Sequence, residues 1–98
     1  MTELLHHTDF EPWLHTPFRL HFTSELLMDA ILEEVNLLNG FTPADRKPFS
    51  LIFKSKQKTE YFSQAMCILE HPEKGEIPIF LVPLGFDGEG MRYEAIFS

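Results

Sequence analysis

The chain is predicted to form one all-β or β-dominated domain over residues 1–98. Two observations lead to this prediction. From residue 47 onward, apolar and polar residues mostly alternate with a period of two, which is typical of half-buried strands. Two turns, at residues 71–75 and 87–90, contain Gly and have the length that joins antiparallel strands.

The composition is that of a small, acidic, globular domain. Apolar residues make up 44% of the chain and ten of them are Phe, which is too many for a disordered segment. The net charge of −7 argues against a general nucleic-acid binder, because phosphate binding needs an excess of Lys and Arg. The single Cys67 excludes an internal disulfide and a zinc site built from cysteines, and it favours a reducing compartment.

Nothing in the sequence predicts a targeting or membrane-spanning segment. Residues 2–12 include three acids and no apolar run of seven, unlike a signal peptide. The longest apolar stretch, Ile77–Leu84, has eight residues, whereas a helix that spans a bilayer needs about 20. We therefore expect a soluble, cytoplasmic protein without a membrane partner.

A short helix and one strand are predicted in the first quarter of the chain. Thr8 and Glu11 have the spacing of a capping box, and Pro12 is tolerated in a first helical turn, so we expect a helix over residues 9–14. Residues 18–22 then alternate between apolar and polar side chains, which predicts a half-buried strand.

Residues 26–38 fit two kinds of structure. As a helix, the segment would gather its apolar residues on one stripe, with Ser24 as N-cap and Gly40 past the end. As a strand, it would place alternate residues on one face and shift phase at a bulge near Glu33 and Glu34. Periodicity alone favours the helix.

Four strands are predicted in the second half of the chain, at 49–53, 65–70, 77–83 and 91–97. The strand at 77–83 is apolar on both faces, and one small sheet with one short helix can hardly cover every outer face. Its prolines, Pro78 and Pro83, also lack N–H donors, which confines such a strand to an edge, a strand start or a bulge.

We therefore expect the strand at 77–83 to lie near a sheet edge, with Phe80 and Val82 turned outward as a partner-binding surface. The alternative is that this face is covered within the chain. In that case the short helix would pack over it with its apolar residues Phe10, Trp13 and Leu14.

A cluster of cations interrupts the acidic sequence. Residues 46–58 contain five Lys or Arg and no acid. If Lys54, Lys56 and Lys58 continue the strand at 49–53, they share one face, because side chains alternate along a strand. These three are further candidates for partner binding, and the alternative is that they pair with the acidic first half of the chain.

No pattern in the sequence predicts catalysis or a cofactor. The four histidines between residues 6 and 21 lack the spacing of a metal-ligand pair, so we interpret them as scattered surface residues. Cys67 lies in an apolar strand and is interpreted as a small core residue. Glu33 and Glu34, as neighbours, are expected to point apart, so a carboxylate pair that shares a proton is not implied. We expect no metal, no cofactor and no enzyme.

Six segments in a fixed order resemble one family. They are Asp9–Pro12, Phe18–Leu20, Pro48–Phe53, Leu69–Pro72 with Gly75, Phe80–Pro83 and Gly90–Phe97. Together they resemble a family of small bacterial proteins known as domain of unknown function 6916, over nearly the whole chain. The family has no established activity, so the resemblance implies an architecture and no function.

The resemblance also bears on the ambiguous segment. Relatives look like β-type sequences there, which implies that residues 26–38 form a bent strand paired with 18–22. This sequence departs from the family pattern at Lys54–Lys58, where members usually carry a short loop with Gly or Pro. The expected fold is then about six mostly antiparallel strands curled into a small barrel or sandwich, with one short N-terminal helix.

The function we expect is a non-enzymatic protein-binding or accessory module that docks through an apolar sheet face or edge. Its partner would be another protein or a second copy of the chain, and not nucleic acid. Two alternatives stay open: a small-ligand-binding β-barrel, and a structural subunit of a bacterial or phage-like assembly. Ten Phe side chains fill an interior more easily than they enclose a pocket of about 300 Å³, which favours docking.

Overall fold

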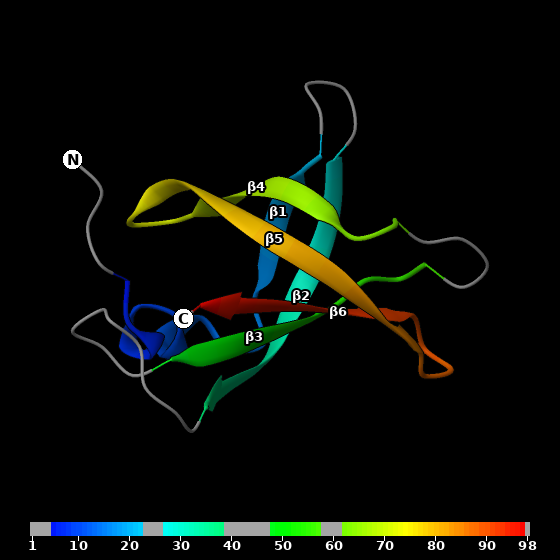
Figure 1. The fold of residues 1–98 in the computed structure, drawn as a ribbon, viewed down its shortest axis with the longest axis horizontal. Helices are drawn as coiled ribbons and strands as arrows, with labels where there is room; N and C mark the ends of the chain where they lie inside the picture. Colours follow the sequence, from blue (N-terminus) through cyan, green and yellow to red (C-terminus); the bar gives the residue numbers. More distant parts are fainter. Residues whose placement is uncertain (1–4, 23–26, 39–47, 58–61, 98) are drawn as a thin grey trace.

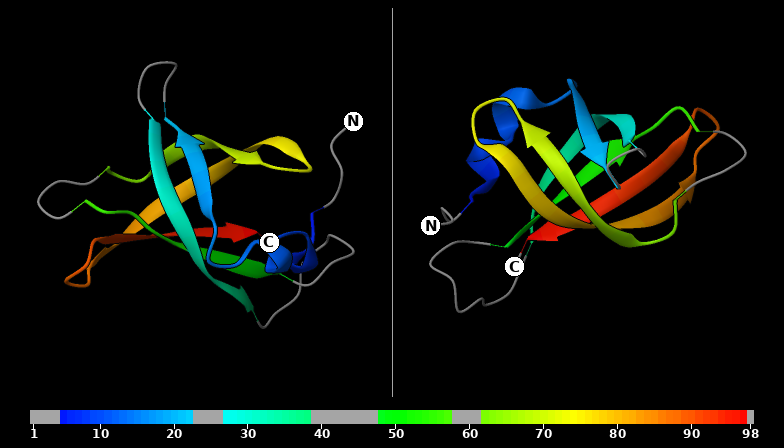
Figure 2. Two further views of the ribbon diagram at one scale, coloured as in Figure 1. Left: turned by 180° about the vertical axis from the view of Figure 1, so that it is seen from behind. Right: turned by 90° about the horizontal axis from the view of Figure 1, so that it is seen from above.

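The computed structural model describes residues 5–22, 27–38, 48–57 and 62–97. Six strands close into an antiparallel barrel in the order β1-β2-β3-β6-β5-β4 (Figures 1 and 2). The strands are β1 (Pro17–His21), β2 (Leu27–Leu37), β3 (Phe49–Lys54), β4 (Ala65–His71), β5 (Gly75–Phe86) and β6 (Met91–Phe97). The predicted β-dominated fold of about six antiparallel strands is therefore confirmed.

Within the segment at 26–38, residues 27–37 form a strand, as the family resemblance implied and against the helical periodicity of the segment. β2 pairs with β1 on one side and with β3 on the other, and its register with β3 shifts between Leu32 and Glu34. The predicted bulge lies at that shift. Up to the bulge, alternate residues of β2 are buried in the barrel core, and this tertiary packing outweighs the local helical pattern.

The short N-terminal helix is present as two 3-10 turns, η1 (His7–Asp9) and η2 (Glu11–Trp13). The predicted cap from Thr8 and Glu11 is wrong: the backbone N–H of His6 donates to the Asp9 carboxylate at 2.8 Å instead. Between the two turns, the Phe10 ring is fully buried among the rings of Phe49, Phe97 and His71.

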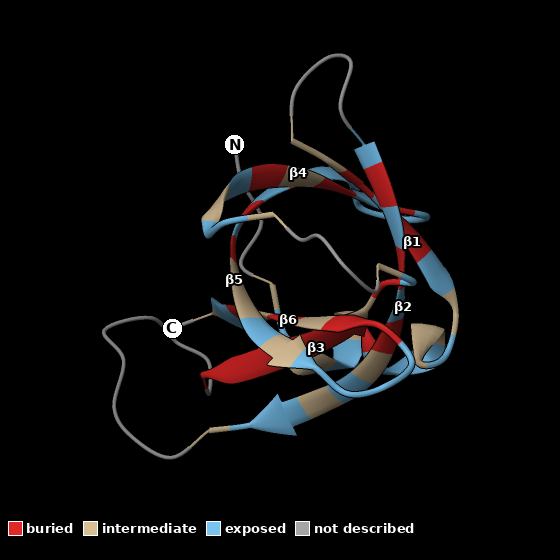
Figure 3. Cartoon of the chain, turned by 90° about the vertical axis from the view of Figure 1, so that its right-hand side faces the viewer, coloured by how far each residue is buried: buried red, intermediate tan, exposed pale blue. Residues whose placement is uncertain are grey.

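The interior of the barrel is filled by side chains from all six strands, and Figure 3 shows the alternation of buried and exposed positions. Close packing of these groups is the main source of the free energy of folding. The buried apolar side chains of the strands that form this core are Phe18, Leu20, Met28, Ala30, Leu32, Phe49, Leu51, Phe53, Cys67, Leu69, Ile77, Ile79, Leu81, Met91, Tyr93 and Ala95.

The prediction that residues 77–83 lie at a sheet edge is wrong, because β5 pairs with both β4 and β6 in a closed barrel. The two neighbours, however, pair with different parts of this long strand: β4 with residues 75–81 and β6 with residues 81–86. Pro78 and Pro83 thus lie where β5 has a partner on one side only. Each half of β5 is locally an edge, where a proline is tolerated.

Candidate functional site

An apolar surface lies on the outer face of β4, β5 and β6, and we call it the outer patch. Met66 of β4 is directly opposite Phe80 of β5, and Ile68 is opposite Pro78. Ile96 of β6 lies one residue past the Ala95–Leu81 pair, on the other flank of Phe80. The outer patch consists of Met66, Ile68, Pro78, Phe80, Val82 and Ile96.

The outer patch is open to solvent at its centre. The exposed fraction is 58% for Met66, 47% for Phe80 and 59% for Ile96, while Val82 is half-buried. The predicted outward orientation of Phe80 and Val82 follows from the pleat, since Ile79 and Leu81 point into the core. Large exposed apolar side chains that lie together on three adjacent strands are typical of a binding surface.

The short helical segment does not cover the outer patch. Phe10 and Trp13 pack against His71 at the end of β4, and Phe10 also contacts Phe49 and Phe97. The segment therefore packs over the core at one end of the barrel rather than over the outer face of β5. The alternative in which Phe10, Trp13 and Leu14 cover Phe80 and Val82 is wrong.

Two carboxylates border the outer patch, one at each end. Glu76 is two residues before Pro78 on β5, and Glu94 of β6 is directly opposite Val82. Neither side chain has a hydrogen-bond or ion-pair partner among the described residues. β4 and β5 contain no Lys or Arg, and Arg92, the one cation of β6, pairs with Glu33 and Glu34.

Lys54, one of the predicted partner-binding residues, is held within the molecule. Its Nζ lies 2.7 Å from Asp87 Oδ2 and 3.3 Å from one carboxylate oxygen each of Glu33 and Glu89. The hydrogen bond to Asp87 is the main cause that raises the pKa of Lys54, and the same bond lowers the pKa of Asp87 to about 2. Lys54 thus joins β2 and β3 to the turn between β5 and β6.

Lys56, the second predicted lysine, does not extend this strand. β3 ends at Lys54, so Lys56 is exposed beyond the strand, and Lys58 lies outside the described residues. The prediction that the three lysines share one strand face is therefore wrong for Lys56. Ser55, the next residue, is buried, and its N–H and hydroxyl both donate to the Met91 carbonyl.

Glu33 and Glu34 do not point apart, contrary to the prediction. Glu33 occupies the bulge of β2, and both carboxylates contact Arg92 of β6, at 3.5 and 3.1 Å. An inserted residue shifts the alternation of a strand, which brings two neighbours to one face. The result is a set of mutually paired charges, which we call the outer ion-pair cluster: Lys54, Arg92, Glu33, Glu34, Asp87 and Glu89.

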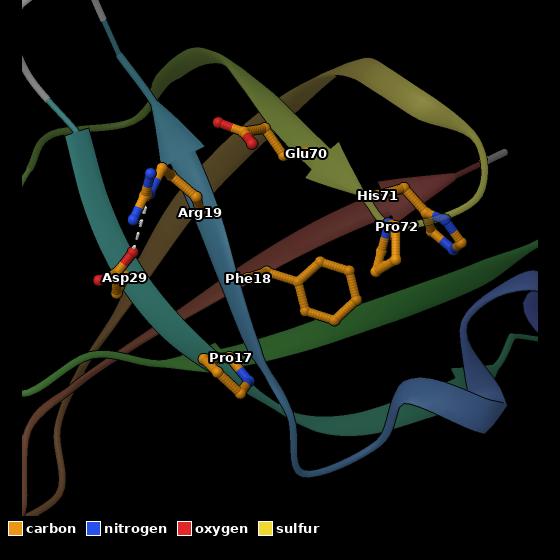
Figure 4. Close-up of a pocket in the computed structure, with 7 residues that line it drawn as sticks. All are labelled: Pro17, Phe18, Arg19, Asp29, Glu70, His71 and Pro72. Atoms are coloured by element: carbon orange, nitrogen blue, oxygen red, sulfur yellow. Dashed lines mark hydrogen bonds and ion pairs between the residues drawn. The ribbon is translucent and has the colours of Figure 1, made fainter.

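A groove of about 350 Å³ lies over the junction of β1 and β4 (Figure 4). β1 pairs with β4 only from Arg19 to His21, and the next residue pairs in the same register would be Phe18 with His71 and Pro17 with Pro72. Neither proline has an N–H to donate, so the ladder opens there. Pro17 and Pro72, which lie just outside the predicted strands at 18–22 and 65–70, could have indicated this gap.

The charged groups at this groove are paired with each other. Arg19 Nε lies 3.4 Å from Asp29 Oδ1, as the dashed line in Figure 4 marks, and Glu70 contacts His21. The floor is formed by the buried side chains of Phe18 and His71. The groove therefore offers a buried aromatic floor and a rim on which Arg19 and Glu70 each already contact a side chain of this chain.

His71 is a structural residue that sequence reasoning missed. It is 4% exposed, and its Nδ1 accepts the backbone N–H groups of Glu73 and Lys74 at 3.0 Å each. Its Nε2 therefore carries the hydrogen and donates to the Asp9 carbonyl at 2.7 Å. The ring ties the N-terminal segment to the turn between β4 and β5, and both nitrogens are occupied.

The four histidines near the N-terminus and Cys67 are the remaining candidates for a chemical role. None of the four histidines between residues 6 and 21 is buried, and within the described ranges no three His, Cys, Asp or Glu side chains form a metal-binding group. Cys67 points into the core, and burial raises the pKa of its thiol to about 11. The interpretation of Cys67 as a core residue is confirmed.

Comparison with known proteins identifies a family and nothing closer. The model of the family described as domain of unknown function (DUF6916) matches residues 5–97. No curated protein and no solved structure matches the chain. None of the helical turns in the described part of the chain has the length to cross a membrane.

Proposed function

The chain belongs to the family of domain of unknown function 6916, and from this premise we propose that it is a non-enzymatic protein-binding module that docks through the outer patch. The single observation that supports this most is the row formed by Met66, Phe80 and Ile96, about half or more exposed on three adjacent strands. Such a row loses its contact with water when a partner covers it, which is the main favourable term in association.

The alternatives receive less support from the described residues. A ligand-enclosing barrel needs an empty interior, whereas Phe49, Phe53 and Tyr93 are fully buried in a filled one. Lys54 is unsuited to docking because its charge is already neutralised by three carboxylates. A reducing compartment such as the cytoplasm stays a prediction, which agrees with the free, buried thiol of Cys67.

The proposal is tested by site-specific photo-crosslinking in the native host. A benzophenone amino acid replaces Phe80 in one variant and Leu37 in a control, because Leu37 is 50% exposed on β2, away from the outer patch. We expect a defined adduct from position 80 that a Val82→Lys change abolishes, and no adduct from position 37. Equal labelling at both positions, or no adduct at 80, would contradict the proposal.

Thermal unfolding of the Val82→Lys variant completes this test. If Val82 belongs to a docking surface, the variant keeps its Tm while it loses the adduct. A large fall in Tm with unchanged crosslinking would show that Val82 acts as a core residue, and docking through this strand would be abandoned.

A further inference from the structure

Resting on the proposed function, we infer that the partner of the outer patch is a segment of a different protein that carries apolar side chains between Lys or Arg residues, and is not a second copy of this chain. Three features lead to this inference: the unpaired carboxylates at the patch, the spacing between them, and the prolines that interrupt the N–H groups of β5.

The charges around the outer patch favour a basic partner. The cations of the neighbouring strands are already used, since Arg19 pairs with Asp29, and Lys54 and Arg92 pair within the outer ion-pair cluster. Glu76 and Glu94 have no such partner among the described residues. Covering Glu94 with an apolar surface would leave a desolvated, unpaired charge, whereas a Lys or Arg would pair with it.

The same charges disfavour a second copy. A two-fold axis through Phe80 would bring the outer patches of two chains together. Glu94 of one copy would then lie near the carboxylates that border the outer patch of the other. Each chain also carries a net charge of −7. Like charges that face each other across an interface oppose association, so a dimer through this face is unfavourable.

The sheet geometry sets the spacing of the basic groups. Along β5, Glu76 and the position beside Glu94 are six residues apart, which is about 20 Å at roughly 3.3 Å a residue. The partner should therefore present cations about 20 Å apart, with apolar side chains between them for Phe80 and Met66. Each half of β5 has one side without a partner among the described strands, but Pro78 and Pro83 lack the N–H groups that an added strand would need, so the contact is made by side chains.

Selection from a random peptide library displayed on phage tests this inference without knowledge of the natural partner. The targets are the wild-type chain, Phe80→Ser, the double variant Glu76→Lys/Glu94→Lys, and a control, Glu11→Lys/Glu73→Lys. The control residues are exposed acids away from the outer patch, and the change in charge is the same. Binders that need Phe80 should be enriched in Lys and Arg on the wild type and the control.

On the double variant, peptides selected on the wild type should bind about tenfold more weakly, since two exposed ion pairs are replaced by repulsion. Phe80-dependent binders without an excess of Lys and Arg, or an equal loss of affinity in the control, would overturn the inference and leave apolar docking intact. A wild-type dimer in sedimentation that Phe80→Ser dissociates would also overturn it. If no binder depends on Phe80, the proposed function itself fails.

Discussion

The outer patch and the outer ion-pair cluster both lie on the outside of the barrel. They differ in whether their charged side chains have partners within the chain. In the cluster, Lys54 and Arg92 neutralise carboxylates from β2 and from the turn that follows β5. In the outer patch, apolar side chains lie beside Glu76 and Glu94 without such partners among the described residues. The charges of the first surface are paired within the chain, whereas in the proposed function the second surface is covered by another molecule.

In this small domain, we assign stability and binding to two different surfaces. In a chain of this length, most residues are needed to form the core or to close the barrel. The cluster connects three parts of the barrel, so changes there should act on folding. No other described part of the chain covers the outer patch, so changes there should act on association rather than on folding.

The largest effect is expected from neighbouring residues of β5 that face opposite sides. Leu81→Ala should cost roughly 2–5 kcal/mol of unfolding free energy, because Leu81 is 1% exposed and its loss leaves a cavity. Phe80→Ala and Leu84→Ala should each cost less than about 1 kcal/mol, because both side chains are about half exposed. Urea denaturation measures all three. A cost for Phe80→Ala close to that of Leu81→Ala would mean that the outer patch is already covered.

A smaller effect is expected in the outer ion-pair cluster. Lys54→Met keeps the length of the side chain but leaves Glu33, Asp87 and Glu89 to repel one another, so the Tm should fall. Lys56→Met is the matched control, because Lys56 is exposed beyond the strand, and its Tm should stay that of the wild type. Equal Tm values for the two variants would show that the ion pairs of Lys54 do not stabilise the fold, and that the outer ion-pair cluster has no role in folding.

The pH dependence of stability should carry the mark of the same cluster. The pKa of Asp87 is about 2 in the folded protein and 3.8 as its ordinary value, so the folded state favours the charged carboxylate. This contribution is present above about pH 4 and is lost as the pH falls towards 2. Asp87→Asn should therefore be less stable than the wild type at pH 6, with a gap that narrows towards pH 2. A constant gap across this range would show that the charge of Asp87 does not matter.

The smallest effect on folding is expected from two adjacent residues of β4. Met66 is 58% exposed in the outer patch, whereas Cys67 is buried with a thiol pKa raised to about 11. Mild peroxide should oxidise Met66 and leave Cys67 intact, with the Tm nearly unchanged and Phe80-dependent binding weakened. Mass spectrometry of the intact protein and its peptides follows both sites. Early loss of the Cys67 thiol in the folded state would contradict the burial of that face.

Most of the local structure could be predicted from alternation and turn chemistry. The strands of the second half and the outward side of Phe80 follow from a period of two, because successive side chains leave a strand on opposite faces. Cys67 could be assigned to the core for the same reason. At residues 26–38 this reasoning was insufficient, because the helical stripe was the better local pattern and the resemblance to a family was needed to choose the strand.

The remaining features depend on residues that are distant in sequence. Barrel closure places β5 between two partners and makes its prolines local edge positions, which no pattern within 77–83 can show. The bulge turns Glu33 and Glu34 to the same cation because Arg92 lies across β3 from them. Alternation is a property of one strand and can be seen along the chain, whereas pairing, closure and the cancellation of charge are properties of neighbours that only the folded barrel brings together.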